Sequence, residues 1–215
     1  MDFVSIDDFL PDILPEVVGC SKYTAQDAVR LAVIEFCKTT GVSVETTEEI
    51  DLTADEDVLT LPTPSGQVES WQVLWMTTDE GTVWPMDRRT LAERNLIWRG
   101  KSGNRPQSYT VLNRKQVRFI PTPDTDVESI LTVHQSFIPK NDASRVDARL
   151  FDEYREAITA GALSRLLKQS GTGWYDPKEA LERKAFFVVE MSQARGLAAK
   201  DFQTGEKSVQ MNPMA

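Results

Sequence analysis

The chain has 215 residues, of which 40% are hydrophobic and 27% charged, with a formal net charge of −9. This composition is typical of a globular protein long enough for one large domain or two small ones. Its apolar runs are too short to span a bilayer, its acidic start is unlike a signal peptide, and an acidic chain is a poor non-specific binder of nucleic acid.

The predicted elements begin with an N-terminal helical part, residues 1–41. Pro11 and Pro15 are expected to cut short a first helical entry. Thr24 is the expected N-cap of a longer helix, and Gly41 is expected to end it. The predicted buried stripe of this helix is Ala28, Val29, Ala32, Val33, Phe36 and Cys37. Cys37 is therefore read as a small core residue, and the two cysteines as reduced thiols, although a disulfide between them stays open.

Residues 42–138 change character, because short apolar alternations are separated by prolines and turn residues. The pattern predicts an inserted small antiparallel β-module, a sandwich or a barrel. The strand candidates are Val68–Thr77, Ser108–Leu112, Gln116–Ile120 and Ile130–Phe137. The first candidate places Trp71, Val73 and Trp75 on one face. Four of the five tryptophans lie in this module, and we expect them to build its core.

Residues 139–202 predict a helical hairpin that completes an antiparallel bundle, and residues 203–215 predict an extended tail. Asp176 is a candidate N-cap with Pro177 at the first helical position, and Glu179 is placed to complete a capping box. The upstream helix carries small residues that allow close helix approach. The downstream helix carries a stripe made of Leu181, Ala185, Val188, Met191 and Arg195.

Catalytic chemistry finds little support in the sequence. His134 is the only histidine and is expected on a solvated sheet face, so neither a nucleophile–histidine pair nor an imidazole metal site is indicated. Seven acids fall between Glu45 and Asp57, and two carboxylates could serve a carbohydrate hydrolase of the muramidase kind. A solvated or interface-facing acidic strip is the favoured interpretation, because this run has few apolar neighbours to raise a pKa.

Charge is distributed unevenly along the chain. Residues 1–57 hold 14 acidic and 3 basic residues, a balance of −11, whereas residues 88–118 hold 9 basic and 1 acidic residue, a balance of +8. Opposite charge on one chain suits a head-to-tail contact between copies, in which each copy presents two different surfaces. The alternative is a nucleic-acid-binding module that uses the basic segment 88–118.

One block carries a resemblance to a known family. An alanine-rich helix ends in Leu166–Leu167 and is followed by Trp174–Tyr175–Asp176–Pro177, then Ala180, Phe186–Phe187 and Ala194–Arg195. This pattern resembles the carboxy-terminal part of tailed-phage head-to-tail adaptors, the neck proteins below the portal that include the tail tubular protein A group.

The resemblance implies an α+β fold, a helical bundle with an inserted β-module, and a structural virion protein without enzymatic activity or cofactor. It further implies a ring of twelve copies in the virion neck, assembled in the host cytoplasm and forming part of the DNA conduit. The implied partners are the portal, a tail or nozzle protein and passing DNA, with no membrane.

For such a protein the working residues are interface residues. The interface candidates are Arg88, Arg89, Arg94, Arg99, Arg105, Glu48, Glu49, Asp55, Glu56, Asp57, Phe202, Val209 and Met211. Trp174, Asp176 and Pro177 are the candidate structural turn.

Overall fold

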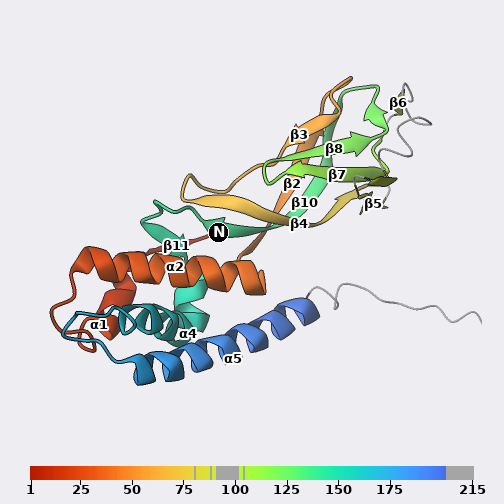
Figure 1. Cartoon of the computed structure of the whole chain (residues 1–215). Coiled ribbons are helices and arrows are strands. Elements are labelled where there is room, and N and C mark those ends of the chain that lie inside the picture. Colours follow the sequence, from red (N-terminus) through yellow and green to blue (C-terminus); the bar gives the residue numbers. More distant parts are fainter. Residues whose placement is uncertain (80, 88, 91–101, 104, 202–215) are drawn as a thin grey trace, which may run out of the picture. The chain divides into compact units, whose positions relative to one another are not determined.

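The computed structural model describes residues 1–79, 81–87, 89–90, 102–103 and 105–201, and at 102, 103, 127, 129, 200 and 201 the backbone alone. Within them the chain is mixed α+β, which confirms the predicted fold class. It divides into two compact units (Figure 1): a β unit, Met1–Val4 with Ser43–Ala148, and a helical unit, Ser5–Val42 with Arg149–Ala215. The antiparallel bundle and the domain boundaries 1–41, 42–138, 139–202 and 203–215 stay predictions.

The helical unit starts with a short capped entry. The Ser5 hydroxyl accepts a hydrogen bond from the Asp7 backbone N–H, and the Ser5 backbone N–H donates to the Asp8 carboxylate, so a capping box opens the 3-10 helix η1 (Ile6–Phe9). Helix α1 (Leu10–Ile13) follows directly. The prediction that Pro11 interrupts the helix is wrong, because Pro11 lies in the first turn of α1, where no backbone N–H is required.

Helix α2 (Lys22–Thr40) is capped one turn earlier than predicted. Ser21, not Thr24, is the N-cap, and its hydroxyl accepts the Thr24 backbone N–H at 3.1 Å. Gly41 ends the helix as predicted, because it adopts a left-handed conformation (φ +67°) that closes the last turn onto Cys37. The predicted stripe is buried, including Cys37, and both cysteines are free thiols.

Helices α4 (Ala148–Leu166) and α5 (Pro177–Asp201) form the C-terminal half of this unit. Asp176 is the N-cap of α5 as predicted, since its carboxylate accepts the backbone N–H groups of Lys178 and Glu179 at 3.0 Å. The predicted capping box does not form. The Asp176 N–H instead donates to the Leu167 carbonyl at 3.0 Å, and the Glu179 carboxylate accepts from Arg183.

Small residues on α4 allow α5 to approach closely, as the sequence predicted. A Cβ atom on Gly161 would lie only 2.8 Å from the ring of Phe187, which is fully buried. On its other side the Phe187 ring packs against Phe36 of α2, with centroids 6.1 Å apart. Phe187 is therefore the side chain that joins α2, α4 and α5.

The β unit is built on a seven-stranded mixed sheet of order β2-β10-β4-β5-β7-β8-β3. Its strands are β2 (Val44–Leu52), β3 (Val58–Thr60), β4 (Val68–Thr78), β5 (Gly81–Pro85), β7 (Ser108–Asn113), β8 (Gln116–Ile120) and β10 (Val127–Pro139). All pairs are antiparallel except β5 with β7, and β7 with β8 is the predicted hairpin. Two short pairs accompany this sheet: β1 (Phe3–Ser5) with β11 (Arg145–Asp147), and β6 (Ser102–Gly103) with β9 (Thr122–Pro123).

The described tryptophans of the β unit do not build its core, contrary to the sequence prediction; the fourth, Trp98, lies outside the described residues. Register shifts between β4 and β10 break the alternation of β4, so that Val73 and Met76 point inward. Trp71 instead lies under the Arg114 guanidinium, 4.5 Å from it, and Trp84 is exposed. Trp75 stacks on the ring of His134 in the neighbouring strand β10. The core consists of aliphatic side chains with Tyr109 and Phe119.

The N-terminus belongs to the β unit, which the sequence did not signal. The Met1 ammonium group pairs with the Glu45 carboxylate at 2.9 Å, and β1 pairs with β11. In β11 itself, buried Asp147 accepts a hydrogen bond from the Ser43 hydroxyl at 2.8 Å. Across the described residues, none of the helices combines the length and apolar character that crossing a membrane requires.

Candidate assembly surfaces

Helix α5 carries a row of apolar side chains on its outward side. We call Leu181, Ala185, Val188 and Val189 the outer face of α5. At 100° per residue they fall within about 100° of one another around the helix. Leu181, Val188 and Val189 expose 64%, 47% and 52% of their surface. Their number on one helix exceeds the scattered exposure that is normal for a monomer.

This arrangement corrects the predicted stripe of α5. Of the predicted residues Met191 is buried, whereas Leu181, Ala185, Val188 and Arg195 face outward. The inward stripe is Ala180, Phe187, Met191, Ala194 and Ala198. Both stripes repeat at helical spacing. The aromatic Phe187 and the alanines, which match the small residues of α4, are the signal that could have identified the inward one.

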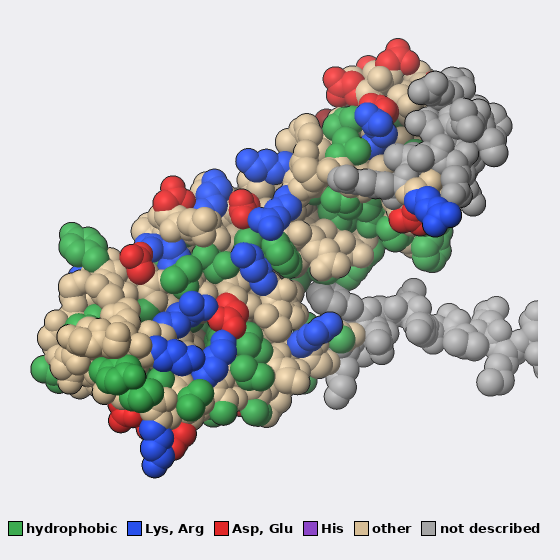
Figure 2. All heavy atoms as spheres, in the orientation of Figure 1, with side chains coloured by type: hydrophobic (Ala, Val, Ile, Leu, Met, Phe, Trp, Pro, Cys, Tyr) green, Lys and Arg blue, Asp and Glu red, His purple; other side chains and the backbone are tan. Residues whose placement is uncertain are grey.

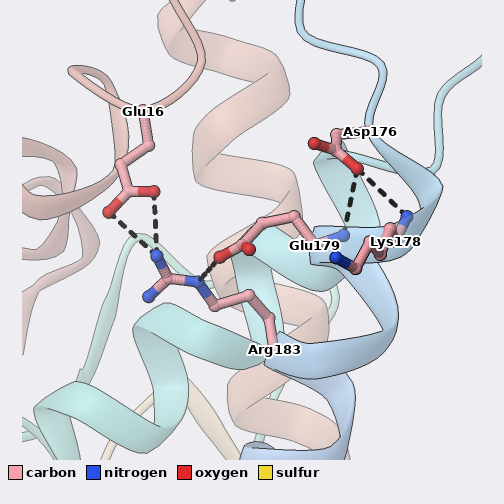
Figure 3. A network of polar contacts seen from close by, with 5 residues as sticks. All are labelled: Glu16, Asp176, Lys178, Glu179 and Arg183. Carbon is pink, nitrogen blue, oxygen red and sulfur yellow. Dashed lines mark hydrogen bonds and ion pairs between the residues drawn. The ribbon is translucent and has the colours of Figure 1, made fainter.

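Ion pairs around Arg183 hold the N-terminal part of α5 in this orientation. Figure 3 shows Arg183 between two carboxylates: Glu179 accepts from its Nε at 2.7 Å, and Glu16 from the connection before α2 accepts at 3.0 Å. The same view shows Asp176 capping the first turn. These contacts reduce the freedom of α5 to rotate about its axis.

A second polar contact, at the next residue of α5, fixes the same orientation. Glu35 of α2 accepts from Lys184 of α5 and from Arg165 of α4, each at 2.5 Å. Burial alone would raise the pKa of Glu35, but the hydrogen bond and charge of Lys184, together with Arg165, outweigh it and lower that pKa. The three helices are thus linked at the margin of the core.

An open groove of about 730 Å³ lies in the helical unit, beside Phe186 of α5. Three of its five acids are paired: Arg155 donates to Asp12, with one contact of 2.7 Å, and Arg183 holds Glu16 and Glu179. The other two, Glu156 and Glu182, are exposed. A general acid requires an apolar setting that favours its neutral form. Carboxylates held by arginine or exposed to water do not meet that requirement, so this groove gives no support to the hydrolase alternative.

A second group of exposed apolar side chains in the helical unit lies on helix α2 and just before it. We call Val18, Tyr23 and Leu31 the α2 outer surface; the first two expose 79% and 80% of their area. Tyr23 and Leu31 are eight residues apart, so they lie on the same side of α2, which also holds the Asp27–Arg30 ion pair and the buried Ile34. Figure 2 shows hydrophobic side chains at several places on the visible face of this unit.

The predicted acidic strip lies in the β unit. Glu48 and Glu49 sit at a bulge of β2, where the register to β10 shifts between Thr47 and Ile50, and both side chains are exposed. Glu49 has a positive φ of 59°, as has Asp55 (61°) beyond the strand. Exposed Glu56 follows Asp55. This placement agrees with the prediction of a solvated strip.

Part of the charge on the β unit is neutralised locally. Asp57 lies 3.0 Å from Arg118, and Arg105 lies 2.7 Å from Asp79. Arg89 is at the surface. The remaining interface candidates, Arg88, Arg94, Arg99, Phe202, Val209 and Met211, lie outside the described residues. Because basic residues of the 88–118 segment pair within their own unit, their charge is less available for a nucleic-acid backbone.

The candidate structural turn precedes α5. Asp176 and Pro177 are the N-cap and first residue of that helix. Gly171, with φ +83°, supplies the left-handed residue of the turn between α4 and α5. Trp174 is half-buried, and its ring lies beside Gly19 of the α1–α2 connection. The turn therefore packs on the N-terminal part of the same unit.

His134 lies on the partly exposed side of β10, away from the buried Leu131 and Val133, and it makes contacts that the sequence did not signal. It is half-buried, its ring stacks on Trp75 with centroids 4.2 Å apart, and Nδ1 lies 2.8 Å from the Thr46 hydroxyl. Burial lowers the pKa of His134, although nearby Glu48 opposes this effect. Among the described residues, no three His, Cys, Asp or Glu side chains gather as a metal site would require.

Comparison with known protein families gives a match to the sequence. The profile of the family described as SU10 adaptor protein matches residues 5–211, which is nearly the whole chain. No curated protein matches the sequence.

Proposed function

The chain belongs to the SU10 adaptor protein family, a family of phage head-to-tail adaptors, and from that premise we propose that it forms a ring joining the capsid portal to the tail. The family makes it a structural adaptor of the phage virion. The proposal adds the ring, the contact with the portal and the role as part of the DNA conduit. Twelve copies are what the resemblance of the C-terminal block implies.

The observation that carries the ring is the outer face of α5. An apolar row of this length on a monomer favours association, because association removes its surface from water. A ring requires each copy to present two different surfaces. The helical unit offers the outer face of α5 and, on another helix, the α2 outer surface.

The proposed partners follow the two ends of such a ring. One end would bind the portal and the other a tail or nozzle protein, while passing DNA would make transient contact with the lumen. The net charge of −9 supports a conduit role, since an acidic lining repels DNA and limits sticking. We propose no enzymatic activity, and assembly in the host cytoplasm before residence in the virion neck.

Electron microscopy of the purified chain, alone and mixed with portal rings from the same phage, tests the proposal. We expect rings, or an added layer on one end of the portal. A chain that neither forms rings nor binds the portal over a range of concentrations would contradict it. Digestion of purified cell wall by the chain would favour the hydrolase instead, and salt-sensitive DNA binding would favour the nucleic-acid module.

A further inference from the structure

The open groove of about 730 Å³ beside Phe186 carries more negative charge than its own arginines neutralise, and we call it the acidic groove. Five carboxylates and two guanidinium groups line it, which leaves a balance of −3. Arg155 and Arg183 bind three of these acids, and Figure 3 shows both partners of Arg183. Glu156 of α4 and Glu182 of α5 are exposed, and neither forms an ion pair with any described residue.

The floor of the acidic groove holds a polar group that the chain itself does not satisfy. Thr159 and Ala160 of α4 are the buried residues of the lining, and Thr159 exposes only 9% of its surface. Its hydroxyl oxygen is fully buried, and none of the described residues provides a hydrogen bond to it. A buried hydroxyl without a partner costs free energy. A ligand that donates a hydrogen bond to Thr159 would recover that cost.

We infer that the acidic groove binds an arginine side chain presented by a segment of another protein. A guanidinium group is positively charged and carries five N–H donors in a planar fork, so it serves several oxygen acceptors at once. The acceptors here are Glu156 and Glu182 at the rim and the Thr159 hydroxyl at the floor. The apolar stem of the arginine has Ala160 and Phe186 beside it.

The size and the apolar part of the acidic groove favour a polypeptide segment over a small free cation. A groove of about 730 Å³ has room for a side chain together with its neighbours. Phe186 is 43% exposed, and an apolar residue next to the arginine would cover it, whereas an amine or a metal ion would not. An adaptor contacts portal and tail components, so it meets protein segments of this kind.

Ion pairs between its walls form the acidic groove before any ligand binds. Arg155 of α4 binds Asp12 of α1, and Arg183 of α5 binds Glu16 of the connection before α2. These contacts fix the walls relative to one another within the helical unit. A preformed site loses less conformational freedom on binding, which favours recognition of a short segment.

Selection from a random heptapeptide library on the immobilised full-length chain tests the inference without knowledge of the partner. We expect the recovered peptides to share an arginine next to an apolar residue. Recovery of lysine as often as arginine at that position, enrichment of acidic peptides, or no enrichment at all would overturn the inference. Ring formation plays no part in these outcomes, so the proposed function is tested separately.

The most enriched peptide, labelled with a dye, is then the probe for the location of the site. Its affinity for the full-length chain is measured by fluorescence anisotropy. Glu156→Gln combined with Glu182→Gln should weaken binding at least about tenfold. Asp152→Asn combined with Glu190→Gln is the matched control, because it removes the same charge from the same two helices outside the acidic groove. An equal loss in both double variants would indicate general attraction to an acidic protein and would overturn the inference.

A change at Thr159 separates binding from folding. Thr159→Val keeps the shape and removes the unpartnered hydroxyl, so we expect the free chain to unfold at the same or a higher temperature. The same change should weaken peptide binding about threefold or more, whereas Thr159→Ser should bind like the wild type. Unchanged affinity of Thr159→Val would overturn the inference. Displacement of the peptide by an equal concentration of spermidine would also overturn it, since any cation would then occupy the groove.

Discussion

Both sides of α5 carry apolar side chains at helical spacing, but their surroundings are opposite. The inward side places Phe187, Met191 and Ala194 against α2 and α4, whereas the outward side leaves Leu181 and Val188 exposed. Hydrophobicity alone does not decide which side is buried. The shape of the surface against which α5 packs decides it, because the ring of Phe187 fits only where Gly161 of α4 lacks a side chain.

Removal of the Phe187 ring, on the inward side of α5, should cause the largest loss of stability. Phe187→Ala leaves a cavity between three helices, and we expect a loss of about 3–5 kcal/mol in unfolding free energy of the helical unit. Denaturant titration followed by helical circular dichroism measures it. Val188→Ala, the adjacent outward residue, should cost less than about 0.5 kcal/mol. Similar losses for both variants would mean that the two sides are not distinct.

A methyl group added at Gly161 of α4 tests the same contact with the Phe187 ring. Gly161→Ala places a Cβ at 2.8 Å from the buried Phe187 ring, and overpacking costs about 1–3 kcal/mol against a helix-propensity gain of about 1 kcal/mol. We expect net destabilisation by thermal unfolding. Gly196→Ala on the open side of α5, where nothing lies within 4 Å, should stabilise by up to about 1 kcal/mol. Stabilisation by both changes would contradict the close approach of the helices.

Loss of the α5 N-cap should have an intermediate effect. Asp176→Ala leaves the backbone N–H groups of Lys178 and Glu179 without their acceptor, at a cost of about 1 kcal/mol. Hydrogen exchange of the first turn should accelerate, while the later turns, which Phe187 holds, keep their protection. Asp176→Asn should restore most of the stability. Uniform acceleration along α5 would show that the cap governs the whole helix.

The Glu35 contacts should give the smallest effect, and one that depends on pH. The folded-state pKa of Glu35 is lowered, so its stabilisation is present above the ordinary glutamate pKa and is lost as pH falls through the folded value. Glu35→Gln should therefore cost at most about 1 kcal/mol near pH 7, because the carboxylate is partly exposed. Its melting temperature should converge with that of the wild type in acid. A constant difference at every pH would exclude the ion pairs as its cause.

The sequence predicted what depends on local chemistry. Gly41 and Asp176 terminate helices as expected, because caps depend on a few adjacent residues. It misplaced the N-cap of α2, since Ser21 and Thr24 are three residues apart and both carry a suitable hydroxyl. It also misplaced Trp71 and Trp75, because a strand's alternation changes wherever a register shift intervenes, and pairing with β10 is not visible from β4 alone.

Which side of α5 faces outward could likewise not be predicted from periodicity alone. Leu181 and Val188 were identified as one stripe, which the structure bears out, but as part of the helix's packing, which it does not. Two stripes at one period are equally regular, and residue size distinguishes them: Phe187 and the alanines of the inward stripe match the small residues of α4, such as Gly161. The local pairing of Arg105 with Asp79 was likewise hidden, because charge totals along the chain do not show which side chains meet.

The division of the chain into units has a consequence for its synthesis. The helical unit draws α2 from the start of the chain and α4 and α5 from its end, whereas all seven main-sheet strands lie between Val44 and Pro139. As the polypeptide leaves the ribosome, all main-sheet strands of the β unit emerge before α4 and α5, the helices that pack with α2. Until α4 and α5 emerge, Phe36 lacks the rings of Tyr154 and Phe187 that pack against it.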